Sequence, residues 1–111
     1  MVWKGFIPQG SLTDASTLKL IKIVESKTEG FNIELSELNK EEFISKTIRH
    51  IKPKFFIHLV KDKVMYIIFQ NHMFKVSRGY PEIETAKNHG KSLGLLEEQM
   101  PFEKLLLNPF M

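Results

Sequence analysis

The chain offers few residues whose type and spacing match known catalytic chemistry. Residues 90–94 read Gly-Lys-Ser-Leu-Gly, the G-x-S-x-G pattern that places a nucleophilic serine on a strained strand-to-helix turn. Here the pattern falls at the end of a predicted helix, in a chain too short for the sheet that surrounds such a serine. The same residues contain Gly-Lys-Ser, but a phosphate-binding loop needs glycine at position 85, where Thr85 stands. Neither motif therefore predicts an active site.

The four histidines do not form a metal-binding pattern. None has the H-x-H or H-E-x-x-H spacing, and the chain has no cysteine to supply a thiolate. His50 and His89 end predicted helices, where the helix dipole favours imidazole, and His72 is expected in a hairpin turn. His58 lies mid-strand between apolar neighbours, and we expect it to be hydrogen bonded on a partly buried face. His58 and Gly90 mark our candidate ligand pocket.

The carboxylates form no ready acid–base pair. Glu41–Glu42 and Glu97–Glu98 are adjacent in the sequence, and adjacent residues on a helix point in different directions. We therefore predict no catalytic residue, no metal site and no cofactor, and we favour a protein that is not an enzyme. Catalysis by residues that are distant in the sequence and meet in the fold stays open.

Size and composition predict one globular domain, residues 1–111. The chain has 111 residues, of which 42% are hydrophobic and 26% charged. It has no cysteine and hence no disulfide. The start, Met1–Gly5, lacks the regions of a signal peptide, and the longest apolar stretch, Val64–Phe69, is too short to cross a bilayer. We expect a cytoplasmic protein with no membrane partner.

Positive charge is concentrated in the middle of the chain. Residues 43–78 hold eight cations against one anion, Asp62, although the net charge of the chain is only +3. Aromatic residues lie in the same segment, and a basic sheet face with exposed aromatics binds single-stranded nucleic acid in several modules. The competing interpretation is that the aromatics are core and the cations keep edges and turns soluble. The nucleic-acid candidates are Lys46, Arg49, Lys52, Lys54, Lys61, Lys63, Lys75 and Arg78.

Residues 54–77 predict a three-stranded meander. Apolar and β-branched runs at 54–60, 64–70 and 73–77 are separated by Lys61–Lys63 and by Asn71-His72. Both alternating sets of residues 64–70 are apolar, whereas a strand with one solvated face alternates apolar with polar residues. This sheet must therefore be covered on both sides.

Two helices flank the meander. Ser36–Ile51 has one apolar stripe, with acidic residues at its start, basic residues at its end and Pro53 as a stop. The second helix, Pro81–Leu93, begins at a proline and is followed by Gly94. Gly90 falls on its buried face and suggests close approach to the sheet.

The first third of the chain is harder to interpret. Val2–Ile7 is expected to be a strand, while residues 12–28 fit both a helix and a hairpin; we favour a hairpin between 18–25 and 31–35. The fold class is then α+β, an antiparallel sheet of five to six strands with two helices in the order βββα-βββα. Residues 95–111 form a docked C-terminal tail, because a free tail would not carry so many leucines.

The surplus of apolar surface predicts an interaction domain. Strands that are apolar on both faces and a leucine-rich tail exceed what two short helices would cover, so we expect a homodimer or a subunit. The alternative function is single-stranded nucleic-acid binding by residues 43–78, and the second alternative is a ligand or enzymatic pocket near His58 and Gly90. The interface candidates are Leu105, Leu106, Leu107 and Phe110.

Overall fold

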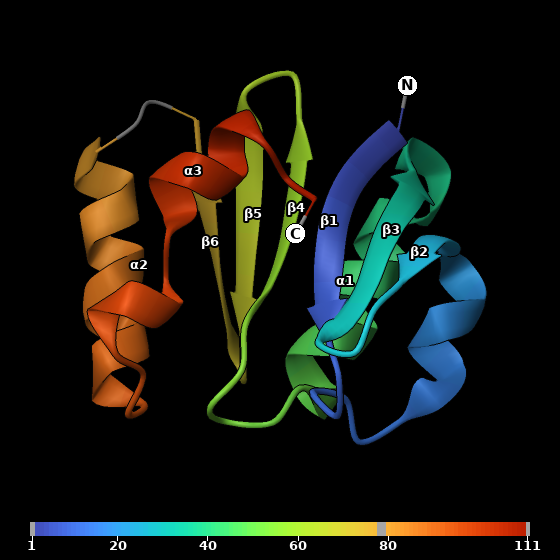
Figure 1. The fold of residues 1–111 in the computed structure, drawn as a ribbon, viewed down its shortest axis with the longest axis horizontal. Coiled ribbons are helices and arrows are strands. Elements are labelled where there is room, and N and C mark those ends of the chain that lie inside the picture. The colour runs from blue at the N-terminus through green and yellow to red at the C-terminus, as the bar shows by residue number, and fades with distance from the viewer. Residues whose placement is uncertain (1, 78–79, 111) are drawn as a thin grey trace.

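The fold is a six-stranded antiparallel sheet with helices on both faces (Figure 1). The computed structural model describes residues 2–77 and 80–110. Along the sheet the strands follow the order β2-β3-β1-β4-β5-β6. The predicted α+β class and the order βββα-βββα are confirmed. The strands are β1 (Val2–Pro8), β2 (Lys22–Ser26), β3 (Gly30–Ser36), β4 (Ile57–Lys61), β5 (Val64–Phe69) and β6 (His72–Val76).

Strand β1 joins two three-stranded halves of the sheet. It pairs with β3 over the whole strand, from Val2 opposite Ser36 to Pro8 opposite Gly30. Its ladder with β4 comprises only the residue pairs Lys4↔Val60, Gly5↔Leu59 and Phe6↔His58. The two halves therefore share a short seam at the centre of the sheet.

The predicted meander is confirmed, but its first strand begins at Ile57 rather than at residue 54, and His72 is placed differently. Asp62 and Lys63 both have positive φ, 51° and 66°, which suits the tight turn between β4 and β5 because it matches the twist of the strands. Asn71, with φ of 61°, makes the turn between β5 and β6. His72 is not a turn residue as predicted but the first residue of β6, where it pairs with Phe69.

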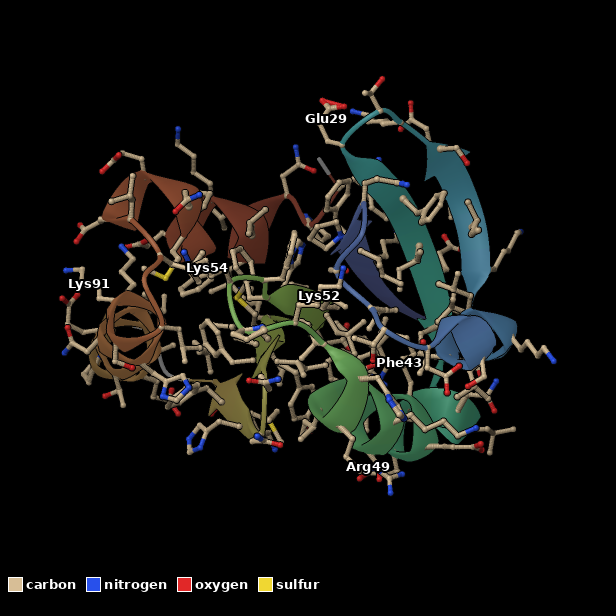
Figure 2. All side chains as sticks on the ribbon, turned by 90° about the horizontal axis from the view of Figure 1, so that it is seen from below. Glu29, Phe43, Arg49, Lys52, Lys54 and Lys91 are labelled. Atoms are coloured by element: carbon tan, nitrogen blue, oxygen red, sulfur yellow. The ribbon has the colours of Figure 1, made fainter. Side chains whose placement is uncertain are left out.

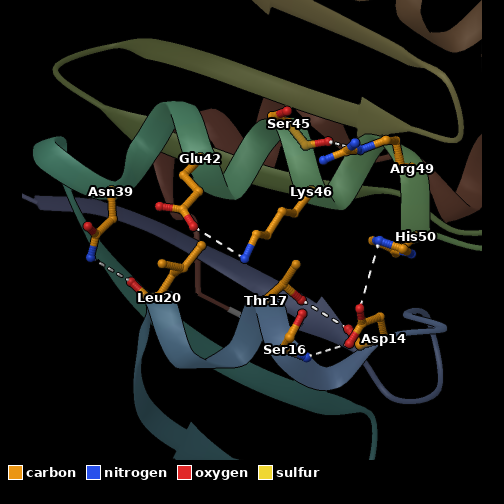
Figure 3. A network of polar contacts seen from close by, with 10 residues as sticks. All are labelled: Asp14, Ser16, Thr17, Leu20, Asn39, Glu42, Ser45, Lys46, Arg49 and His50. Atoms are coloured by element: carbon orange, nitrogen blue, oxygen red, sulfur yellow. Dashed lines mark hydrogen bonds and ion pairs between the residues drawn. The ribbon is translucent and has the colours of Figure 1, made fainter.

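The first third of the chain contains both a hairpin and a short helix. The β2–β3 hairpin is present, but β2 begins at Lys22, and a 3₁₀ helix, η1 (Ala15–Leu20), precedes it. The Asp14 carboxylate caps η1 by accepting the Ser16 N–H at 2.8 Å, and the Asn39 side chain donates to the Leu20 carbonyl at 3.2 Å (Figure 3). These contacts hold η1 against the first long helix, so the strand predicted from residue 18 starts later.

Each face of the sheet carries its own hydrophobic cluster, as the apolar strands predicted. Helix α1 (Lys40–His50) packs on one face, and α2 (Tyr80–Ser92) lies with the tail on the other (Figure 1). The α1 cluster is built around Trp3, Ile33, Leu35, Phe43, Ile57, Leu59 and Ile68. The tail cluster is built around Met65, Ile67, Phe69, Val76, Ile83, Met100 and Phe102.

The helices differ in detail from those predicted. The segment expected to be a helix from Ser36 divides into a 3₁₀ turn, η2 (Glu37–Asn39), and α1. The tail is more regular than expected, because it contains η3 (Glu97–Gln99) and a short helix, α3 (Phe102–Leu107). None of the described helices is both long and apolar enough to cross a membrane.

Gly90 approaches the tail more closely than the sheet. A Cβ atom added there would lie 2.3 Å from the Met100 sulfur and 3.3 Å from the Phe69 ring. The predicted close approach is therefore present, and its tightest contact is with Met100, a residue of the tail.

Candidate functional site

The tail residues proposed for an interface are only partly available. Leu105 is 4% exposed and belongs to the tail cluster, while Leu106 and Phe110 are half-buried. Leu107 is 88% exposed. The tail thus covers much of the apolar sheet face from which we inferred a partner, and Leu107 is the candidate that remains fully accessible.

The basic segment does not form one continuous face. Lys46 pairs with Glu42 at 3.2 Å, and Arg49 donates to the Ser45 carbonyl at 3.3 Å on α1 (Figure 3). Lys52 and Lys54 lie in the loop that enters β4 (Figure 2). Three further candidates are spread over the other half of the sheet: Lys61 at the end of β4, Lys63 in the β4–β5 turn and Lys75 on β6. Arg78 lies outside the described residues.

Phe43, Tyr66 and Phe69 of the same segment are core residues, and its other aromatics are partly buried against the two clusters. Phe69 and Tyr66 are 0% and 8% exposed. Phe56 packs edge-on against Phe102, with ring centroids 5.0 Å apart. Since base stacking needs accessible ring faces, the buried rings of Tyr66 and Phe69 offer no stacking platform for nucleic acid.

A polar cluster around Glu37 stabilises one end of the sheet. Glu37 accepts a hydrogen bond from the Trp3 indole at 2.9 Å, and Lys61 and Lys40 also bind its carboxylate. Hydrogen bonds from Lys61, then Trp3 and Lys40, lower the Glu37 pKa to about 2. Both ammonium groups also lie over the Trp3 ring, so this cluster is fully explained as structure.

His72 and His89 form an aromatic cluster that the sequence did not predict. Their rings stack at 4.8 Å, and Phe74 and Phe69 pack beside them. The His89 Nε2 atom is buried without a hydrogen-bond partner, and burial, followed by the His72 charge, lowers the His89 pKa. Among the described residues no three potential ligands gather as a metal site would require. The pair is therefore interpreted as packing between β6 and α2.

Strand β2 is an exposed sheet edge. All five of its residues are exposed, and no described strand pairs with its outer side. Ile23 and Val24 are 43% and 45% exposed. The register against β3 shifts between Ile23 and Glu25, where a bulge inserts an extra residue. An unpaired edge with apolar side chains is a template for strand pairing.

The bulge places two opposite charges on one face of β2. Lys22 lies opposite Glu34, and Glu25 lies opposite Asn32, whose side chain donates to the Glu25 carboxylate at 2.8 Å. Because Glu34 and Asn32 are two residues apart in β3, they share a face, and so do Lys22 and Glu25. In a regular strand, residues three apart would point to opposite faces.

His58 lines a groove beside the tail. It lies opposite Phe6 in the β1–β4 ladder and is only 1% exposed. Its Nε2 lies 2.6 Å from the Pro109 carbonyl oxygen. Because a carbonyl oxygen can only accept a hydrogen bond, Nε2 must carry the hydrogen and donate it. Burial lowers the His58 pKa to about 4, so the ring is neutral at pH 7. Nδ1 is then an unprotonated acceptor, and no described residue donates to it.

The groove comprises two hollows that share lining residues. The inner recess, about 210 Å³, is lined by Phe6, Pro8, Glu29, Phe56, His58 and Gln99. The outer part, about 370 Å³, shares Phe6 and Glu29 and adds Lys104 and Phe110. Glu29 lies near the tip of the β2–β3 hairpin (Figure 2). Gly90 does not line either part, so only His58 of the two predicted pocket residues belongs to it.

Comparisons with protein-family models, with curated proteins and with solved structures gave no match. The function of this chain is therefore inferred from its own residues.

Proposed function

We propose that this chain is an interaction domain that forms a homodimer by pairing its β2 edge with β2 of a second copy. The observation that supports this proposal most directly is the edge itself, in which every residue is exposed and two are large and apolar. Edge strands are commonly protected by charge, proline or bulges, and β2 itself carries a bulge and the charged residues Lys22 and Glu25. Here Ile23 and Val24 are left accessible at the middle of the edge.

The charges of β2 are complementary to themselves. In an antiparallel pair related by a twofold axis, Lys22 would lie opposite Glu25 of the second copy, and Ile23 opposite Val24. Both charged residues occupy one face because of the bulge, so the two Lys–Glu pairs form on the same side of the joint sheet. Each opposite-charge pair contributes roughly 0.2–1 kcal/mol, and the apolar pairs add their burial.

This location differs from the tail interface that the sequence predicted. Leu107 is accessible, but its neighbours Leu105 and Leu106 pack in the tail cluster. We also propose that the dimer is cytoplasmic. A chain without cysteine folds independently of disulfides and suits a reducing compartment.

Charge-reversed variants test the pairing directly. Lys22→Glu and Glu25→Lys should each be monomeric, because each brings like charges together across the twofold axis. An equimolar mixture should form a heterodimer, in which both cross-strand pairs again have opposite charges. Native mass spectrometry of the wild type, of each variant and of the mixture measures all three expectations.

The controls distinguish β2 from other apolar surface. Val24→Lys should abolish the dimer, whereas Leu96→Lys, at a 59% exposed site at the start of η3, should leave it intact. If Leu107→Lys dissociates the dimer and Val24→Lys does not, the interface is the tail. A wild-type protein that is monomeric at every concentration measured would refute self-association.

A further inference from the structure

We propose that the recess above His58 binds a small neutral aromatic molecule that carries a hydroxyl or N–H donor. The site is separate from the β2 edge, so this inference stands independently of the dimer. Its ligand would lie between Phe6 and Phe56 and donate its hydrogen bond to Nδ1 of His58.

The shape of the recess suits a single aromatic ring. Its volume is about 210 Å³, and apolar cavities of roughly 150 Å³ in other proteins bind benzene. Phe6, Phe56 and Pro8 supply its apolar lining beside His58. Aromatic ligands pack against such rings in offset or edge-to-face arrangements.

The hydrogen-bonding requirement follows from the tautomer of His58. Nε2 uses its hydrogen for the Pro109 carbonyl, which leaves Nδ1 as an acceptor without a donor from the described residues. His58 lines the recess, so a donor on a bound ligand can take the place of water at this acceptor. The ligand must therefore contribute an O–H or N–H group, and a ring that carries only acceptors would not fit.

The charges at the rim do not favour an ion. Glu29 stands at the inner recess, and Lys104 and Lys27 stand at the outer part together with the same Glu29. None of the described lysines or arginines lines the inner recess, and its histidine is neutral at pH 7. A neutral ring in the recess, with any polar substituent directed towards the outer part, agrees best with this arrangement.

Phenol and toluene are matched probes of the proposal, because they share a shape and differ in the donor. Without an acceptor in the site, toluene would bind more tightly, since the phenol hydroxyl would lose its hydrogen bond to water. With His58 as acceptor, phenol should bind about fivefold more tightly, the ratio that one net hydrogen bond of about 1 kcal/mol provides. Amide shifts in two-dimensional NMR give both affinities.

The histidine nitrogen itself provides a second readout. Long-range ¹H–¹⁵N spectra should show the Nδ1 resonance of His58 move on addition of phenol and stay in place with toluene. Gln99→Trp should block the recess from its exposed rim without altering His58, and phenol binding should be lost. Equal or tighter binding of toluene, shifts that do not saturate, or unchanged phenol binding in Gln99→Trp would each overturn the proposal.

Discussion

At the residue scale, the buried imidazole of His58 links the stability of the tail to pH. The unfolded chain protonates this histidine near pH 6.5, whereas burial lowers its folded pKa to about 4. Between these values the unfolded state binds more protons, so the free energy of unfolding falls as pH falls from about 6.5 to about 4, by about 3 kcal/mol in total. Above this window both states are neutral and the full stability is present.

We expect His58→Leu to remove this dependence. At about pH 7 the variant should be less stable, because it loses the hydrogen bond to Pro109, and the difference from wild type should shrink towards pH 4.5. Urea unfolding at a series of pH values measures the difference. A constant difference across the window would mean that His58 titrates in the folded state much as it does in the unfolded one.

Glu37 makes the stability of the protein depend on pH in a second, more acidic range. Its pKa is lowered to about 2 in the folded state, so its stabilisation is present above about pH 4.5 and is lost as pH falls towards 2. Glu37→Gln should weaken the acid dependence in that window and change the emission of Trp3, the single tryptophan, which donates to Glu37. Fluorescence-monitored acid titration measures both effects. Glu98→Gln, at an exposed position, should reproduce neither.

At the element scale, the packing of α2 against the tail depends on the absence of a side chain at Gly90. Gly90→Ala gains about 1 kcal/mol of helix propensity, but its Cβ would lie 2.3 Å from the Met100 sulfur. Overpacking of a core typically costs about 1–3 kcal/mol, so we expect a net loss of stability. In a Met100→Ala background the same change should be neutral or stabilising. Thermal unfolding of the four proteins in this cycle gives the coupling, and additive effects would contradict the contact.

The elements that could be predicted are those with a strong local pattern. The meander and the two long helices followed from apolar periodicity and from proline and glycine at their ends. Helix α3 was missed because its six residues are too few to show a period. The start of β2 was misplaced because η1 depends on the Asp14 cap and on contacts with α1, which involve residues distant in the sequence.

The candidate sites could be predicted only in part, because they too depend on contacts between residues distant in the sequence. His58 was recognisable as a polar residue inside an apolar strand, but its partner Pro109 lies 51 residues away. The groove requires β1, the β2–β3 hairpin and the tail to meet, and the bulge that aligns Lys22 with Glu25 is visible only in the register. No local sequence pattern encodes either arrangement.

At the scale of the whole molecule, the two halves of the sheet are joined by the short seam between β1 and β4. The α1 cluster crosses this seam, since Trp3 of β1 packs against Tyr66 of β5 with ring centroids 5.1 Å apart. We therefore expect the wild type to unfold as one unit, with coincident transitions by circular dichroism and by Trp3 fluorescence. Separate transitions would mean that the shared cluster does not couple the halves.

Gly5→Ala should disrupt the seam itself. A Cβ at Gly5 would lie 2.0 Å from the His58 carbonyl oxygen, and because that atom is backbone it cannot move without displacing β4. We expect a loss of about 3 kcal/mol or more, and amide exchange should accelerate first at the β1–β4 ladder. Val2→Ala, at a 38% exposed site of the same strand, should cost far less. If Gly5→Ala were equally mild, β1 and β4 would have to separate at little cost, and the halves would be joined by the α1 cluster alone.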